Sequence, residues 1–519
     1  MTPSAALRAV GRACWALAVL ASAGCSPGPG AGSEAPLAVA RLPRLVPDHA
    51  GAVIPPNLAP PSFRVDEPGT RYRLTVRGGG GEAIRLEAGD GGFRIPIRPW
   101  RRLLAANAGG TVRVQAEVRG ADGRWSAYQA VVDTVATEPL DRYLTYRLLK
   151  PLYSKYVSMG IYQRDLEGFS ERTVLHNRSV GGACLNCHTF NNQRTDAVIL
   201  HTRGAYGLTM LLHAGGRTVS VRTQTRLNAA PAAYPSWHPG GRLLAFSVNK
   251  LSMFYHTQGE TRDVFDSASD VLVYDVASNT VSTTPALAEP EVLEVWPCWS
   301  ADGRYLYFTR APQRPPEEFR QVRYDLARIP YDAGTRTWGA VETVLAAQEV
   351  GGSISQPRVS PDGGYLAFTV AEYGHFPIYL ASSDVYLLDL ATGAWRRLPQ
   401  NSERADTWPS FSSNSRWLCF SSKRRDGLFA RPHFSYLDAR GETHAPFILP
   451  QEDPRFYDSF VQTYNRPELT LEPVKTTPRE LAQALRDSAH VLHAQADPGV
   501  VLAERSGGAS EPYSAGRRP

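Results

Sequence analysis

A short motif recurs four times in the second half of the chain and limits the fold more than any other feature. The copies read "YPSWHPGGRLLAFSV" (234–248), "WPCWSADGRYLYFTR" (296–310), "QPRVSPDGGYLAFTV" (356–370) and "WPSFSSNSRWLCFSS" (408–422). Each has proline second, then a tight turn and a strand of alternating apolar residues. A strand–turn–strand hairpin pattern follows each copy, with Asn, Gly or Asp at the bend. Four strands per unit, repeating at roughly 50–60 residues, predict the blades of a β-propeller.

The repeated pattern P-x-x-S-x-D-G-x-x-x-x-F resembles the TolB-type β-propeller repeat. This resemblance implies an architecture and says almost nothing about activity. A related segment, "TDAVILHTRGAYGLTMLLHAGGRTVSVRT", precedes the four copies and gives a fifth recognisable blade. We expect a sixth blade to be completed from residues 450–475 or from the segment before residue 180.

A C-x-x-C-H motif opens the first of these blades, in "GGACLNCHTF". Its residues are Cys184, Cys187 and His188. This spacing is the attachment signature of c-type haem, in which two thiols add across the haem vinyl groups and the histidine binds the iron. A thioredoxin-like pair has no use for the histidine, a zinc site needs a second ligand pair, and a disulfide across C-x-x-C is short and strained. We therefore predict one covalent haem c, with the motif in the turn before the inner strand of its blade.

Most of residues 140–475 is similar to a family of exported proteins that join a C-x-x-C-H segment to TolB-like repeats. The similarity rests on "YRLLKPLYSKYVSMGIYQRDLEGF", "CLNCHTF…LHTRGAYGLTMLL", "EYGHFPIYLASSDVYLLDL" and "SSNSRWLCFSSKRRDGLFARPHFSYLDARG…FILPQEDPRFYDSFVQTYNRPEL". The family has no settled reaction, so the resemblance implies the fold and not the activity.

The second axial ligand of the iron would be a histidine or a methionine. His201 is our first candidate because it lies on the strand after the motif, and a core histidine is the equally weighted alternative. Met210 is the alternative distal ligand, although a core position suits it better. Arg203 shares a strand face with His201 and could contact a haem propionate. We expect His238, His256, His375 and His433 to be polar surface residues.

The N-terminal segment has the pattern of a secretory signal peptide. Arg8 and Arg12 precede an apolar run that is too short to span a bilayer, and small residues follow it. Cleavage after Ala23 is one interpretation. The other, which we favour, is a lipobox in which Cys25 is lipidated and the following Pro/Gly-rich stretch is a tether. Either way we expect export, to the periplasm or to the outer membrane as a lipoprotein.

Strand and turn patterns divide the chain further. We expect a signal peptide (1–25), a flexible linker (26–58), a sandwich resembling fibronectin type III domains with six strands and no helix (59–136), a helical connector (137–179), the propeller (180–475), and a helix with a disordered tail (476–519). The predicted class is therefore mostly β, with a propeller of five to six blades. Cys298 and Cys419 are predicted to be buried thiols without a bridge.

Motifs and charge exclude several functions. The net charge of +6 comes without a basic, aromatic-rich run, so no nucleic-acid partner is expected. No G-x-S-x-G elbow, H-E-x-x-H, P-loop or dinucleotide fingerprint occurs. The acidic stretch "RDVFDSASD" (262–270) is predicted to be a solvated loop and not a calcium site. Three functions remain: electron transfer with a partner protein, then a propeller that binds a partner at its face and carries a structural or sensory haem, then haem peroxidase activity.

Overall fold

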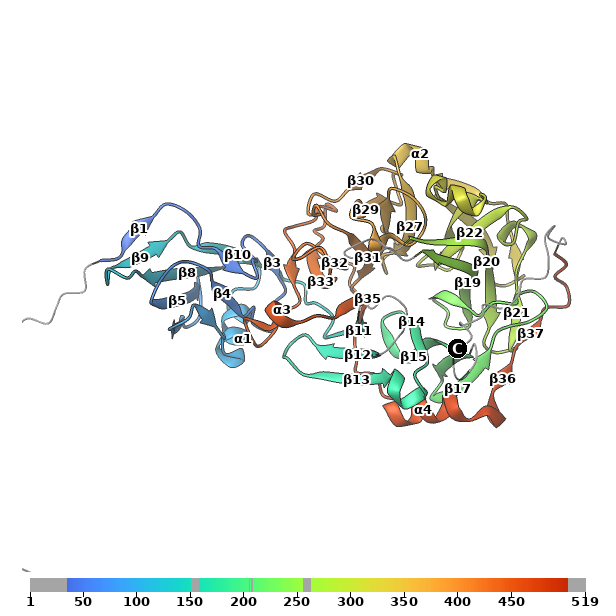
Figure 1. Ribbon diagram of the computed structural model, residues 1–519, viewed down its shortest axis with the longest axis horizontal. Coiled ribbons are helices and arrows are strands. Elements are labelled where there is room, and N and C mark those ends of the chain that lie inside the picture. Colours follow the sequence, from blue (N-terminus) through green and yellow to red (C-terminus); the bar gives the residue numbers. More distant parts are fainter. Residues whose placement is uncertain (1–34, 151–157, 205, 207–208, 255–262, 503–519) are drawn as a thin grey trace, which may run out of the picture.

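A computed structural model describes residues 35–150, 158–204, 206, 209–254 and 263–502. The protein is mostly β, with a ring of sheets and a smaller lobe beside it (Figure 1). None of the helices in these ranges is long and apolar enough to cross a membrane.

Six groups of strands form the ring in the described part of the chain, and we number them as blades; one short bridge joins blades 2 and 3 into a single larger sheet. Blade 1 contains β14 (Cys184–Asn191), β15 (Arg194–Arg203), β16 (Thr209–Ala214) and β17 (Arg217–Arg222). Blade 2 contains β18 (Ala233–Trp237), β19 (Leu243–Phe254), β20 (Asp263–Asp275) and β21 (Thr280–Ser282). Blade 3 contains β22 (Val292–Trp299), β23 (Tyr305–Pro312), β24 (Asp325–Asp332) and β26 (Glu342–Leu345), with β25 (Thr337–Trp338) pairing with β24.

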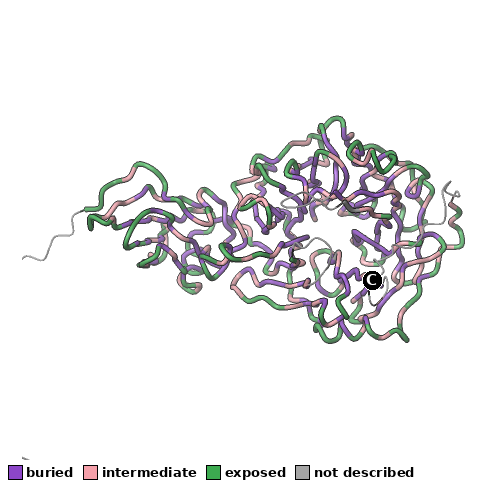
Figure 2. Tube along the Cα trace, in the orientation of Figure 1, coloured by how far each residue is buried: buried purple, intermediate pink, exposed green. Residues whose placement is uncertain are grey.

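The remaining blades complete the circle. Blade 4 contains β27 (Ser353–Val359), β28 (Tyr365–Ala371), β29 (Asp384–Asp389) and β30 (Trp395–Arg397). Blade 5 contains β31 (Asp406–Phe411), β32 (Trp417–Ser422), β33 (Arg431–Tyr436) and β34 (Phe447–Ile448). Blade 6 contains β35 (Thr463–Thr470), β11 (Tyr143–Leu149), β12 (Met159–Asp165) and β13 (Glu171–His176). The buried residues follow the strands, and the turns at the rim are exposed (Figure 2).

Blade 6 joins the two ends of the propeller. Its innermost strand β35 comes from the C-terminal side and pairs antiparallel with β11 from the N-terminal side. The helical connector predicted for residues 137–179 is therefore wrong, apart from a short 3-10 helix, η1 (Asn177–Val180). The reason is burial on both faces: β11 has buried residues at consecutive positions, so it lacks the alternation that marks a half-buried strand.

The smaller lobe is a two-sheet sandwich. One sheet contains β1 (Leu37–Val39), β3 (Val53–Ile54), β5 (Arg71–Gly78), β6 (Ile84–Ala88), β8 (Thr111–Arg119), β9 (Trp125–Tyr128) and β10 (Val131–Val135). The other contains β2 (Leu45–Val46), β4 (Phe63–Val65) and β7 (Gly92–Phe93). The predicted linker (26–58) is thus wrong from residue 37 onward, because strands of two or three residues pair with distant partners and show no periodicity of their own.

Short helices occupy the gaps between the sheets. They are α1 (Ile97–Ala105), α2 (Ala347–Val350), α3 (Phe456–Ser459), α4 (Pro478–Arg486), and the 3-10 helices η2 (Pro285–Leu287), η3 (Pro316–Gln321), η4 (Pro377–Tyr379) and η5 (Ser488–His490). The sandwich was expected to have no helix, yet α1 forms after Pro96 and buries Trp100, Leu103 and Leu104 on one face. The expected C-terminal helix is α4, and its continuation pairs β36 (Leu492–His493) with β17 and β37 (Gln495–Ala496) with β21.

The sandwich packs against blade 5. Trp417, Phe434 and Phe447 of that blade share one apolar core with the sandwich residues. The Trp417 indole N–H donates to the Glu138 carbonyl oxygen at 3.2 Å, and the Asp141 carboxylate accepts from the Ser413 hydroxyl at 2.6 Å. This interface holds the sandwich against one side of the ring.

Candidate functional site

The innermost strands of the blades share a break in register at the same position. In five of them a residue with positive φ precedes a proline, and the two together face a single residue of the neighbouring strand. The five pairs are Tyr234–Pro235, Trp296–Pro297, Gln356–Pro357, Trp408–Pro409 and Arg466–Pro467. This is a β-bulge, which accepts proline because the bulged residue makes no ladder hydrogen bond.

In blade 1 the equivalent pair is Cys187–His188. The pairing of β14 with β15 shifts between Asn186 and Thr189, as it does at the five X-Pro pairs. The predicted location in a turn before the inner strand is therefore wrong, because the motif lies on the innermost strand itself. The strand after the tight turn, which looked like the inner one, is the second strand of each blade.

His188 is wholly buried, and neither ring nitrogen makes a hydrogen bond of standard geometry to a described residue. The backbone of Thr145 is close enough to favour the protonated ring, but burial outweighs it. Burial lowers the pKa of the imidazole well below its usual range, and the positive charges of Arg466 and Arg147 lower it further. The ring is edge-on to Phe190 at 6.1 Å between centroids. His188 is therefore a neutral imidazole, which is the form that binds a metal.

Cys184 is a buried cysteine at the start of the same strand. It belongs to an apolar cluster with Val180, Leu185 and Met159. The side chain of Cys187 and the whole of Cys25 lie outside the described part of the structure. Cys298 and Cys419 are buried free thiols, as predicted.

His201 and Arg203 are in contact, as their shared strand face predicted. The Arg203 Nε–H donates to His201 Nε2 at 3.0 Å, which leaves the buried Nδ1 as the atom without a partner among the described residues. Burial lowers the pKa of His201 well below its usual range, and Arg203 adds to the effect. His201 lies opposite Asn186 on one side and Met210 on the other, and Met210 packs in an apolar cluster between blades 1 and 2.

The donors at β14 fit a covalently attached haem. Two cysteines in C-x-x-C spacing and an adjacent buried, neutral imidazole are the residue types that this group would use. The X-Pro ring encloses an axial cavity of only about 20 Å³. Such a cavity holds one water-sized occupant, so a porphyrin held by β14 would lie outside the axis.

A second buried polar cluster lies near the same end of the propeller. The Asn249 side-chain N–H donates to the Asp266 carboxylate at 2.7 Å, and His375 Nε2 lies 3.5 Å from that carboxylate. Burial raises the pKa of Asp266 and lowers that of His375. The predictions of a solvated loop over 262–270 and of a surface His375 are therefore wrong for the described residues. Nothing local in the sequence reveals the cluster, because its members come from blade 2 and from the loop after β28 of blade 4.

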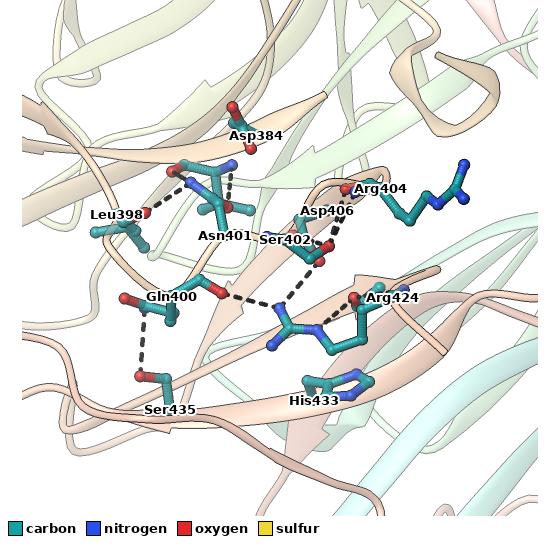
Figure 3. Close-up of polar contacts among 12 residues, drawn as sticks. Asp384, Leu398, Gln400, Asn401, Ser402, Arg404, Asp406, Arg424, His433 and Ser435 are labelled. Carbon is teal, nitrogen blue, oxygen red and sulfur yellow. Dashed lines mark hydrogen bonds and ion pairs between the residues drawn. The ribbon is translucent and has the colours of Figure 1, made fainter. Parts of the chain in front are cut away.

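A third network joins blades 4 and 5, as Figure 3 shows. The buried Asp406 carboxylate accepts from the Ser402 backbone N–H and hydroxyl and from Arg424 at 3.2 Å. His433 is buried beside it, with burial lowering its pKa well below the usual range, so its predicted surface location is wrong. His238 is only partly buried, and His256 lies outside the described residues. In the network around Asp406, the opposite charges of Asp406 and Arg424 compensate each other, so this network is structural.

Comparisons with known proteins assign neither a family nor an activity. No family model matches the chain, and no curated protein matches it. Similar solved structures include an oligogalacturonate lyase in complex with manganese, at 12% identity and TM-score 0.33 over 59% of this chain and 73% of that one. A nidogen/laminin complex is similar at 9% identity and TM-score 0.34, over 58% of this chain and 93% of that one. A prolyl endopeptidase is similar at 12% identity and TM-score 0.32, over 58% of this chain and 42% of that one. Similarity at these levels assigns no activity.

Proposed function

We propose that the protein is an exported monohaem c-type cytochrome that transfers electrons to or from a partner protein in the periplasm or at the cell surface. The observation that carries the proposal is His188. It occupies the position that proline takes in the other five blades, and neither of its buried ring nitrogens makes a hydrogen bond of standard geometry in the described structure. Leaving a polar group buried and unpaired costs about 1–3 kcal/mol, so an iron that takes one of these nitrogens explains why the chain retains it.

In this proposal Cys184 and Cys187 hold the haem through thioether bonds, and His188 is the proximal ligand. A bound haem supplies reversible one-electron transfer at its iron. Arg147 of β11, Arg358 of β27 and Arg466 of β35 act on His188 through their positive charge. Their positive charge favours the reduced form of a nearby redox centre, so we expect these arginines to raise its potential.

The test is a denaturing gel stained for haem after expression with a cytochrome c maturation system. The full-length wild-type band should stain, and the double variant Cys184→Ala/Cys187→Ala should not. The matched control is Cys298→Ala/Cys419→Ala, which removes two buried thiols outside the motif and should keep the stain. An unstained wild-type band at normal protein yield would overturn the proposal.

A further inference from the structure

The axial cavity has an unusual lining. All the residues around it belong to the innermost strands of blades 2 to 6: Tyr234, Pro235, Trp296, Pro297, Gln356, Pro357, Arg358, Trp408, Pro409, Ser410, Arg466 and Pro467. None of these described residues is acidic. With a volume of about 20 Å³, the cavity has room for a single small occupant.

Two buried N–H donors at this lining have no partner among the described residues: the Nε2 amide of Gln356 and the Nε1 indole of Trp408. Only 4% of Gln356 and 7% of Trp408 are exposed. The orientation of the amide is fixed, because Gln356 Oε1 accepts from the Trp408 backbone N–H at 2.8 Å and from the Thr369 hydroxyl at 3.0 Å. A backbone N–H can only donate, so the oxygen faces it and the NH₂ group faces elsewhere.

Positive charge accompanies these donors. Arg358 and Arg466 line the cavity, and the Arg466 guanidinium lies over the Trp408 ring at 5.9 Å from its centroid. Glu468 follows Pro467 on the same strand, but its Oε1 accepts from the Thr189 hydroxyl at 3.0 Å and the Phe190 N–H at 2.9 Å, toward β14. The cavity therefore combines hydrogen-bond donors with two guanidinium groups.

We propose that the axial cavity is a binding site for one monatomic anion, chloride in ordinary buffers, held by Gln356, Trp408, Arg358 and Arg466. A water molecule suits the site less well, because its two hydrogens need acceptors whereas the unpartnered groups are donors. An anion accepts from both unpartnered donors, and the guanidinium groups that line the same cavity attract it. The site lies on the propeller axis, so its occupant links five blades at once and does not depend on the haem.

The experiment compares the melting temperature of the full chain in sodium bromide with that in sodium gluconate at equal ionic strength. Gluconate is far too large for the cavity, and equal ionic strength makes the screening of charges the same in both salts. We expect the wild type to melt roughly 2 °C or more higher in bromide, because an anion that binds only the folded state stabilises it. Crystals grown in bromide should show an anomalous scattering peak on the axis between Trp408 and Arg466.

Two variants and a matched control make the test specific. Trp408→Phe and Gln356→Met each remove one unpartnered donor and should abolish the difference between the two salts. Trp296→Phe is the control, because Trp296 holds the equivalent position in blade 3 but its indole N–H already donates to the His375 carbonyl oxygen at 3.0 Å. It should keep the bromide effect even where its melting temperature falls. A wild type that melts alike in both salts, or a map with water and no bromide on the axis, overturns the proposal.

Discussion

Two buried histidines of blade 1 have different surroundings, and these separate their roles. His188 makes no hydrogen bond of standard geometry at either ring nitrogen in the described structure, whereas His201 accepts from Arg203 through Nε2. The two axial ligands of one haem approach the iron from opposite faces of the porphyrin. His201 lies on the strand next to His188, opposite Asn186, and cross-strand neighbours two positions apart are separated by only about 7–8 Å. The register therefore gives His201 a place beside His188 and not across an iron from it.

We expect His201→Ala to leave the spin state of the ferric haem unchanged, and His188→Ala to alter it. His201 would then orient Arg203, and Arg203→Lys should resemble His201→Ala because lysine cannot reproduce the planar contact. Visible absorption and electron paramagnetic resonance spectra of the ferric proteins measure this. A change from low-spin to high-spin in His201→Ala alone would show instead that His201 is the distal ligand, as first predicted from the sequence.

The innermost strand is the element that sets the chemistry of each blade. Its bulge places two residues outside the ladder, so proline is tolerated there and a special side chain can replace it. Five blades use X-Pro, and blade 1 uses Cys187–His188. The C-x-x-C-H motif therefore places Cys187–His188 at the position that an X-Pro pair takes in the other five blades, and it is not an inserted loop.

This equivalence predicts that His188→Pro folds. We expect its melting temperature to lie within roughly 3 °C of that of haem-free wild type, because proline removes a buried unpaired imidazole and fits a position without a ladder bond. The matched control is Val198→Pro in the interior of β15, where the ladder runs between Phe190 and His213. That control should prevent folding. Circular dichroism melting curves of both variants test this prediction. An unfolded His188→Pro would show that the bulge of β14 does not accept proline as the innermost strands of the other blades do.

Much of the architecture could be predicted from the sequence, because the four repeat copies carry their turn and strand patterns locally. Blade 6 could not be recognised in this way, since β11 is buried on both faces and its partner β35 comes from far along the chain. The candidate site could likewise be predicted only in part from the sequence. The C-x-x-C-H spacing is local and is visible in the sequence, whereas the Asp266–His375 contact and the donors around the axial cavity are assembled from separate blades.

At the scale of the whole molecule, closure of the ring places several titratable groups in the interior. β35 pairs with β11, so a strand from the C-terminal side completes blade 6 and closes the ring. His188, His201, His375 and His433 are all buried, and burial is the largest cause of the lowered pKa of each imidazole. His49 is the opposite case, because the carboxylate of Asp133, 2.9 Å away, raises its pKa despite its burial.

These four histidines predict a propeller that is sensitive to mild acid. Their folded-state pKa is depressed, so below pH of about 6.5 the unfolded chain binds protons that the folded chain does not. Their contribution to stability is complete above that pH and is lost as the pH falls, by about 1.4 kcal/mol per pH unit for each histidine. His49 does not offset this loss, because the stability from a raised pKa is already fully present below about pH 6.5.

We therefore expect the urea midpoint of unfolding to fall steeply between pH 7 and pH 5.5. His433 provides the matched test, because it lies in blade 5 away from the haem motif and His433→Gln removes one of the four buried titrating groups. In the haem-free protein, where His188 is not an iron ligand, the variant should lose about a quarter of the pH dependence; expressed with the maturation system, it should still acquire haem. Urea denaturation followed by tryptophan fluorescence at pH 7, 6.5, 6 and 5.5 measures both proteins. A wild-type midpoint that does not change over this range would mean that the buried histidines take up protons as readily in the folded protein as in the unfolded chain.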